Sequence, residues 1–377
     1  MERGDYTAVD LTFILPQLII GFGIFLILAL SFNLEYGYAG QPNLGKVFFY
    51  AIGAFVAGAL TTRLLWVFLG SPADVDFLGD AGGVLRLAYA RANPLVIIGV
   101  FVVALFVAGL AGAGFGYLAS YPALRLRGDF LAIVLIAVGE VGRVFALNYP
   151  PLAGGVFGLS GVPNPFIWLE NARAVDAAYA VLVMGIAAGF YLFARRLTNT
   201  PFGRLLKSVR DDEDAASVYG KKAPRVKGVA LMVANGMAGV AGALYVFYVQ
   251  FVYALDYIPL LSFIVVAMVI LGGVANNWGV VIGAAFLTLL DFVTRPTFLT
   301  LLGISARPPF DVNYLRYLSI GLIIVLVLMF KPKGLVPERP VKTPALGAAR
   351  KYARKVPKGP VAGASSDEPG EGDLEAD

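Results

Sequence analysis

Residues 12–34, TFILPQLIIGFGIFLILALSFNL, form the stretch that decides the fold, because they contain no charged residue. A helix rises about 1.5 Å per residue, so a run of this length crosses the roughly 30 Å hydrocarbon core of a bilayer. Further predominantly apolar runs have the approximate bounds 47–68, 95–119, 129–148, 176–196, 228–250, 260–275, 279–295 and 314–330. The pattern predicts an all-α polytopic membrane protein, a bundle of about nine or ten transmembrane helices that includes broken ones.

The composition supports this class and excludes others. The chain is 58% apolar and 15% charged, whereas soluble domains are about half apolar and a quarter charged. It has no Cys and no His, which excludes thiol and imidazole catalysis, disulfides and Cys/His metal sites. The carboxylates within the apolar runs are scattered rather than grouped, so we expect no catalytic residue, no cofactor and no metal, and therefore not an enzyme. The net charge of +5 lies in loops and indicates membrane topology rather than nucleic acid binding.

Lys and Arg gather in the loop 195–227 and in the segment that follows the last apolar run. Cytoplasmic loops of membrane proteins are enriched in these residues, so both segments are predicted to be cytoplasmic. Four apolar runs lie between these two segments. An even number of spans returns the chain to the same side of the membrane, so the two assignments agree. Arg125 and Arg127 would also be cytoplasmic, and the N-terminus and the loops 70–93 and 149–175 would face outward.

The sequence divides into two parts of different character. Residues 1–340 are expected to form one transmembrane domain in the cell membrane, with a cytoplasmic loop at 197–227. Residues 341–377 are rich in Pro, Gly, Ala and charged residues, a composition typical of a disordered segment, here a cytoplasmic tail.

The cytoplasmic loop contains a helical module. Thr200 is a good N-cap and Pro201 suits the first helical position. The apolar residues that follow are spaced at i, i+3, i+4 and i+7, which predicts one buried face; they are Phe202, Leu205, Leu206 and Val209. The four acidic residues 211–214 suit the start of a second short helix, and Gly220 can end it in a left-handed conformation. Composition alone is compatible with two functions of this module. It could bind a cytoplasmic partner, or it could be an interfacial helix that only anchors the loop to the membrane surface.

The order Asp214-Ala215-Ala216, followed by Gly220, resembles the EAA loop of ATP-binding cassette importer permeases, with Asp in place of the usual Glu. Over about residues 12–336 the chain resembles the branched-chain amino acid permeases of the LivM/LivH family. The blocks that carry this resemblance are 30–34 (LSFNL) with 37–45 (GYAGQPNLG), 124–133 leading to 139–143, 154–163 (GGVFGLSGVP, typical of the M-type subunit), and the module at 200–220 with 239–244 and 271–279. Residues 330–335 (FKPKGL) also match the ending of the family. Their order along the whole length makes the resemblance specific.

The resemblance implies a permease subunit that moves branched-chain or other hydrophobic amino acids by alternating access without hydrolysing ATP. The implied partners are a second permease subunit, two cytoplasmic ATPase subunits, an extracytoplasmic substrate-binding protein and membrane lipid. The implied ATPase-coupling residues are Gly203, Arg204, Asp214, Ala215, Ala216 and Gly220. Two alternative functions are not excluded: a urea or short-amide permease of the same superfamily, and a secondary amino acid transporter. The secondary transporter would not need the cytoplasmic loop.

The first two apolar runs are separated by a segment that indicates a broken helix, with Gly37, Gly40, Pro42 and Gly45. Its residues 40–46 match the first seven positions of a P-loop, but no hydroxyl residue follows and no strand precedes, so no nucleotide site is predicted. Irregular backbone at membrane depth survives only where protein or a water-filled cavity surrounds it. We hypothesise that the polar residues Asn33, Gln41 and Asn43 border a translocation pathway; that they satisfy the broken backbone is an equally open alternative.

Three further positions are candidates for the pathway. Glu140 lies three residues before Arg143 on one predicted helix face, and the two are expected to pair, because isolated charges in lipid cost at least about 2.5 kcal/mol each. Gly272 and Gly273 are a possible second break, before a turn at Asn276. Lys46 is a departure from the family, which commonly has His there.

Overall fold

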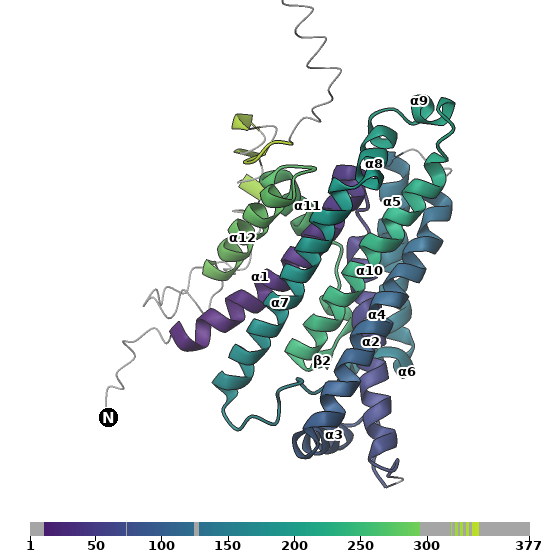
Figure 1. Cartoon of the computed structure of the whole chain (residues 1–377). Helices are drawn as coiled ribbons and strands as arrows, with labels where there is room; N and C mark the ends of the chain where they lie inside the picture. Colours follow the sequence, from purple (N-terminus) through teal and green to yellow (C-terminus); the bar gives the residue numbers. More distant parts are fainter. Residues whose placement is uncertain are drawn as a thin grey trace, which may run out of the picture. The chain divides into compact units, whose positions relative to one another are not determined.

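The computed structural model describes residues 11–72, 74–123 and 128–294, with single positions and short stretches between 318 and 338. These residues are almost entirely helical, which confirms the all-α prediction (Figure 1). In chain order the elements are α1 (Leu11–Phe32), the π-helix η1 (Asn33–Tyr38), α2 (Lys46–Phe68), α3 (Asp80–Ala92), α4 (Pro94–Ala123), α5 (Gly128–Asn148), α6 (Pro150–Ala153), η2 (Gly155–Phe157), β1 (Leu159–Ser160), α7 (Ala172–Asn199), α8 (Pro201–Asp211), α9 (Glu213–Val218), α10 (Ala223–Val249), β2 (Phe251–Val252), η3 (Ala254–Asp256), α11 (Leu260–Gly272) and α12 (Asn277–Val293).

Within the described residues, six helices are long and apolar enough to cross a bilayer. They are Ile14–Tyr38, Lys46–Phe68, Pro94–Ala119, Phe130–Asn148, Ala172–Asn199 and Ala223–Val249. The shorter apolar helices α11 and α12 occupy two further predicted runs. The run predicted at 314–330 falls mostly outside the described residues, as do Arg125, Arg127 and the tail 341–377. The described chain is a polytopic helical membrane protein.

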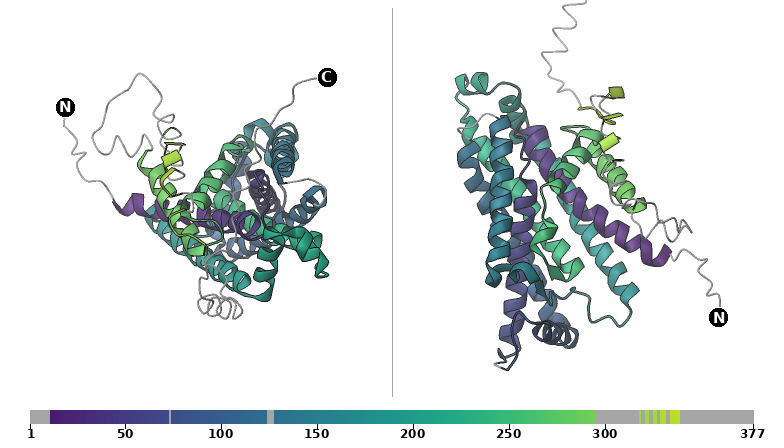
Figure 2. Two further views of the ribbon diagram at one scale, coloured as in Figure 1. Left: turned by 90° about the horizontal axis from the view of Figure 1, so that it is seen from above. Right: turned by 180° about the vertical axis from the view of Figure 1, so that it is seen from behind.

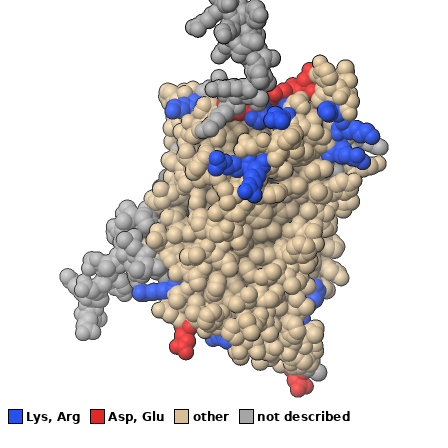
Figure 3. Space-filling view, in the orientation of Figure 1, with Lys and Arg blue, Asp and Glu red and all other residues tan. Residues whose placement is uncertain are grey.

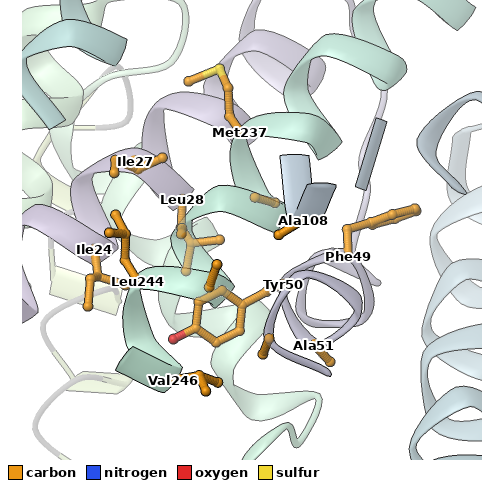
Figure 4. Packing of buried hydrophobic residues seen from close by; sticks show 14 of the residues in the cluster. Ile24, Ile27, Leu28, Phe49, Tyr50, Ala51, Ala108, Met237, Leu244 and Val246 are labelled. Carbon is orange, nitrogen blue, oxygen red and sulfur yellow. The ribbon is translucent and has the colours of Figure 1, made fainter. Parts of the chain in front are cut away.

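Helix α10 is the centre of the bundle and packs against α4, α2 and α1. Glycines allow this close approach, because a Cβ on Gly239 would collide with the α4 backbone and one on Gly53 would collide with Gly239. Figure 4 shows how Leu28 of α1, Tyr50 of α2 and Leu244 of α10 meet in the core. Such tight packing is a main source of helix association in lipid, which explains the stripes of small residues in the sequence.

Two stretches leave the α-helical conformation beside this core. The first is the predicted break, where α1 passes into η1 and residues 39–45 are irregular before α2 begins. The second follows α10, where β2 pairs antiparallel with β1 through Leu159 and Val252 before the chain reaches α11. Val252 lies against Gly58 in the middle of α2. Figure 2 shows α1 running obliquely across the bundle, beside α7 and α12.

The described helices place different elements at their two ends. Helices α8 and α9 lie at one end, and α3 lies at the other (Figure 1). Lys and Arg gather at the α8–α9 end, and a belt with few charges follows below it (Figure 3). The connection 70–93 between two spans contains a helix, α3, that the sequence pattern did not predict. The fully buried Arg86 anchors this helix by donating hydrogen bonds to the carbonyls of Phe77 and Ser160, both 2.8 Å long.

Candidate functional site: a two-helix loop joined to a helix break

The predicted module between Thr200 and Gly220 is present as α8 and α9. Leu206 and Val209 on the apolar face of α8 are buried, as the spacing predicted. Thr200 does not cap α8 with its side chain; its hydroxyl donates to the carbonyl of Leu197 instead, at 2.7 Å. The module is therefore seated on the rest of the chain through one face of α8.

Two glycines set the geometry of this module. Gly203 is buried where α8 turns off α7, and a Cβ there would collide with the backbone of Thr198. Gly220 has a φ of +73° and ends α9 in the left-handed region, as predicted. Both residues therefore have a role in shaping the loop.

Helix α9 exposes some of its predicted contact residues and buries another. Asp212 caps it by accepting a hydrogen bond from the amide of Ala215, at 2.9 Å. Ala216 is buried against the chain itself, whereas Ala215, Val218 and Tyr219 are exposed. Arg204 and Asp214 are also exposed. Val218 and Tyr219 are 86% and 82% exposed, so the tip of the module presents large apolar side chains that the sequence analysis had not singled out.

Arg210 joins α8 to the helix break. Its guanidinium donates to the carbonyl of Gly37 at 2.6 Å and to the carboxylate of Glu338 at 3.2 and 3.4 Å. Lys207 pairs with the same carboxylate at 2.6 Å. Burial disfavours the charge of Arg210, but hydrogen bonds and charge from Asp211 and Glu338 outweigh it and raise the pKa of Arg210 above its usual range. A displacement of α8 would therefore act directly on the break.

The polar residues predicted in the break have different surroundings. Asn33 is fully buried; its amide donates to Asn277 at 3.1 Å and its oxygen accepts from the backbone of Ala275 at 2.9 Å. Asn43 is also buried and bonded to other side chains. Gln41 is buried, and neither polar atom of its amide has a hydrogen-bond partner among the described residues. Asn33 and Asn43 thus hold the break, whereas Gln41 is left with unused hydrogen-bonding capacity.

A buried charged network, which the sequence analysis did not find, surrounds Asn43. Lys46 pairs with Glu35 at 3.1 Å and donates to Asn235 of α10 at 2.8 Å. Asn43 donates to Glu35 at 3.1 Å. All four side chains are completely buried. The available signal was Glu35 itself, a carboxylate directly after the first apolar run, on the opposite side of the break from Lys46.

The predicted pair on α5 is confirmed. The Nε of Arg143 lies 3.1 Å from each carboxylate oxygen of Glu140, and Nη2 also bonds to this carboxylate. Unlike the network in the break, the pair lies at the surface of the subunit, with side-chain exposures of 41% for Glu140 and 19% for Arg143.

Gly272 and Gly273 lie where α11 turns toward α12, near residues of the C-terminal segment. Gly272 is in close contact with Gly279. Gly273 has a φ of +121°, and a Cβ there would collide with the backbone of Val336. The amide of Val336 donates to the carbonyl of Gly272 at 2.9 Å. Asn276 caps α12, which confirms the predicted turn. Both glycines therefore serve close backbone packing, and their part in a pathway stays a prediction.

Comparisons with known proteins agree with this architecture. The family described as "Branched-chain amino acid transport system / permease component" matches residues 14–328. A probable branched-chain amino acid transport permease protein LivM from Methanocaldococcus jannaschii is 30% identical over 338 residues, which cover 88% of this chain and 96% of the relative.

Two bacterial relatives are each named high-affinity branched-chain amino acid transport system permease protein LivM. The Escherichia coli protein is 28% identical, over 87% of this chain and 71% of the relative. The Salmonella typhimurium protein is 29% identical, over 83% and 68%. No solved structure gave a significant match. Because the match to the family covers nearly all of the described helices, the chain belongs to the family of branched-chain amino acid transport permease components.

Proposed function

We propose that this chain is the permease subunit of an ATP-binding cassette importer that takes up branched-chain or other hydrophobic amino acids. The names of the relatives support the substrate. The observation that carries the proposal is the tip of α9, where Val218 and Tyr219 are exposed outside the spans. Exposed apolar side chains of this size mark a protein contact, and a short helix of this kind fits a groove of a partner.

The distribution of charge supports a cytoplasmic position for this contact. Lys and Arg gather around α8 and α9 (Figure 3), and such segments stay in the cytoplasm. Glu338 bonds to Lys207 and Arg210 of α8, so the C-terminal segment would be cytoplasmic as well. The end with α3 would face outward, toward an extracytoplasmic substrate-binding protein.

In this arrangement two ATPase subunits grip the α8–α9 modules of this chain and of a second permease subunit. Ala215, Val218 and Tyr219 supply the contact, with the exposed charges of Arg204 and Asp214 beside it. Movement of α8 reaches the helix break through the bond between Arg210 and Gly37. This chain supplies the translocation pathway and the helices that transmit the movement, and its ATPase partners hydrolyse ATP.

The test uses co-purification with the ATPase subunits and uptake of labelled leucine into proteoliposomes that contain the whole complex. Val218→Asp should abolish both, because it places a charge in the proposed apolar contact. Val84→Asp is the matched control, since Val84 is 65% exposed on α3 at the opposite end. Retention of the ATPases and of uptake by Val218→Asp would contradict the contact. Uptake of urea but not leucine by the wild-type complex would contradict the substrate.

A further inference from the structure

A pocket of about 370 Å³ lies between α2, α4 and α5. Its walls are almost entirely apolar and include Val47, Ala51 and Phe55 of α2 and Val138 and Phe145 of α5. Small-molecule sites have volumes of about 300–1,000 Å³ and mostly apolar walls with a few polar groups. The pocket is therefore large enough for a small ligand.

The pocket lies beside the middle of α5, one of the helices long and apolar enough to cross a bilayer. Val138 is the eleventh residue of α5, which places it about 15 Å along a helix of about 30 Å. Binding sites of membrane transporters lie near the midplane, next to helices with interrupted backbone. Here the interrupted segment before α11 contributes Tyr257 to the pocket wall.

Arg143 and the hydroxyl of Tyr257 are polar groups in the pocket wall, and Glu140 bonds to Arg143 beside the pocket without lining it. Arg143 lines the pocket and holds Glu140 through Nε and Nη2, which leaves Nη1 without a hydrogen-bond partner among the described residues. The Glu140 side chain is 41% exposed within a span, where charges are costly in lipid. Tyr257 is only 3% exposed, and its hydroxyl has no partner in the described part of the chain.

The glycines of α5 keep the pocket open on the side of the charged pair. Gly139 and Gly142 both line it, and a Cβ on Gly142 would press on the ring of Phe48, which lines it too. Larger residues at these two positions would fill the space next to Arg143.

We propose that this pocket binds the amino acid during its passage. Arg143 receives the α-carboxylate, Glu140 receives the α-ammonium group, and the apolar walls take the aliphatic side chain. An amino acid zwitterion carries its opposite charges close together, as the pair on α5 does, and charge-assisted hydrogen bonds are the stronger kind. A neutral amide such as urea would use neither charge. The proposal rests on the function proposed above and assigns its substrate a site.

The first test reverses the order of the two charges. The double variant Glu140→Arg with Arg143→Glu keeps an ion pair and the net charge of α5, so the complex should still co-purify with its ATPases. It presents each charge of the ligand with a like charge, and leucine uptake by the whole complex should fall at least about tenfold. Wild-type uptake by this variant would overturn the proposal.

The second test changes the apolar wall and does not touch the charges. Val138→Trp should weaken binding of labelled leucine to the purified complex, without binding protein, by about tenfold or more, and binding of alanine by less. Ile133→Trp is the control, since Ile133 is 64% exposed on the same helix and does not line the pocket. Equal leucine binding in both variants would show that another occupant, such as a partner helix, fills the pocket. A wild-type complex that takes up no leucine at all would instead contradict the proposed function.

Discussion

Two ion pairs within the spans have opposite surroundings. Glu35 and Lys46 are completely buried, lie on either side of the helix break, and bond to Asn43 and Asn235. The second pair, on α5, is made by residues three positions apart on one helix and lies at the subunit surface. The first pair joins three parts of the fold, whereas the hydrogen bonds of the second pair, among the described residues, stay within its own helix.

The difference in surroundings indicates which pair stabilises the fold and which pair can bind a ligand. A buried charge that loses its partner keeps its full desolvation cost, so a buried pair is expensive to break. A pair on one exposed helix face connects no second element of the fold, and a ligand that carries both charges can bond to either partner. The network at the break therefore fixes the fold, and the pair on α5 is available for binding.

The largest effect is expected for Lys46→Met. It leaves the Glu35 carboxylate buried without its cation, which should destabilise the protein by about 3–5 kcal/mol. The measurement is the melting temperature of the purified protein in detergent, together with its abundance in the membrane. We expect poor expression and a melting temperature lowered by many degrees.

The control for Lys46→Met removes both charges at once. The double variant Glu35→Leu with Lys46→Met leaves no unpaired charge, and apolar replacement of a buried pair is often nearly neutral. It should recover part of the lost stability, although Asn43 and Asn235 keep unused polar atoms. A double variant less stable than Lys46→Met alone would contradict the assignment of the network as an ion pair.

An intermediate effect, on coupling more than on stability, is expected for Arg210→Ala. This change removes the bond to Gly37 and frees the break from α8. ATP hydrolysis by the complex should continue while leucine uptake per ATP falls several-fold, because motion of α8 no longer reaches the break. Arg196→Ala is the control, since Arg196 is exposed near the same end. Unchanged coupling in Arg210→Ala would show that the break responds to another element.

The sequence predicted the features that depend on short separations along the chain. Apolar runs predicted the helices, and the spacing of Glu140 and Arg143 predicted their pairing. The network at the break could not be predicted in the same way, because Asn235 is 189 positions from Lys46 and no local pattern relates them. Helix α3 was missed for a similar reason, since its anchor at Arg86 is the carbonyl of Ser160, 74 positions away.

The orientation of α9 shows the same limit on a smaller scale. The resemblance treated Ala215 and Ala216 as one contact surface, but Ala215 is exposed whereas Ala216 is buried. Which side is buried depends on how α8 and α9 rest on the bundle, and the motif does not contain that information.

The smallest effect on stability is expected for Glu140→Gln. The pair is partly exposed and local, and the Gln amide oxygen can still accept a hydrogen bond from Arg143, so the change should lower stability less than the change at the completely buried Lys46. Addition of leucine supplies the second half of the test, because a ligand raises the melting temperature of the state that binds it. Leucine should stabilise the wild-type complex measurably and the Glu140→Gln complex much less, since the amide no longer attracts the ammonium group. If Glu140→Gln instead destabilised the complex as strongly as Lys46→Met, a partner would have to bury the pair on α5, and the contrast between the two pairs would fail.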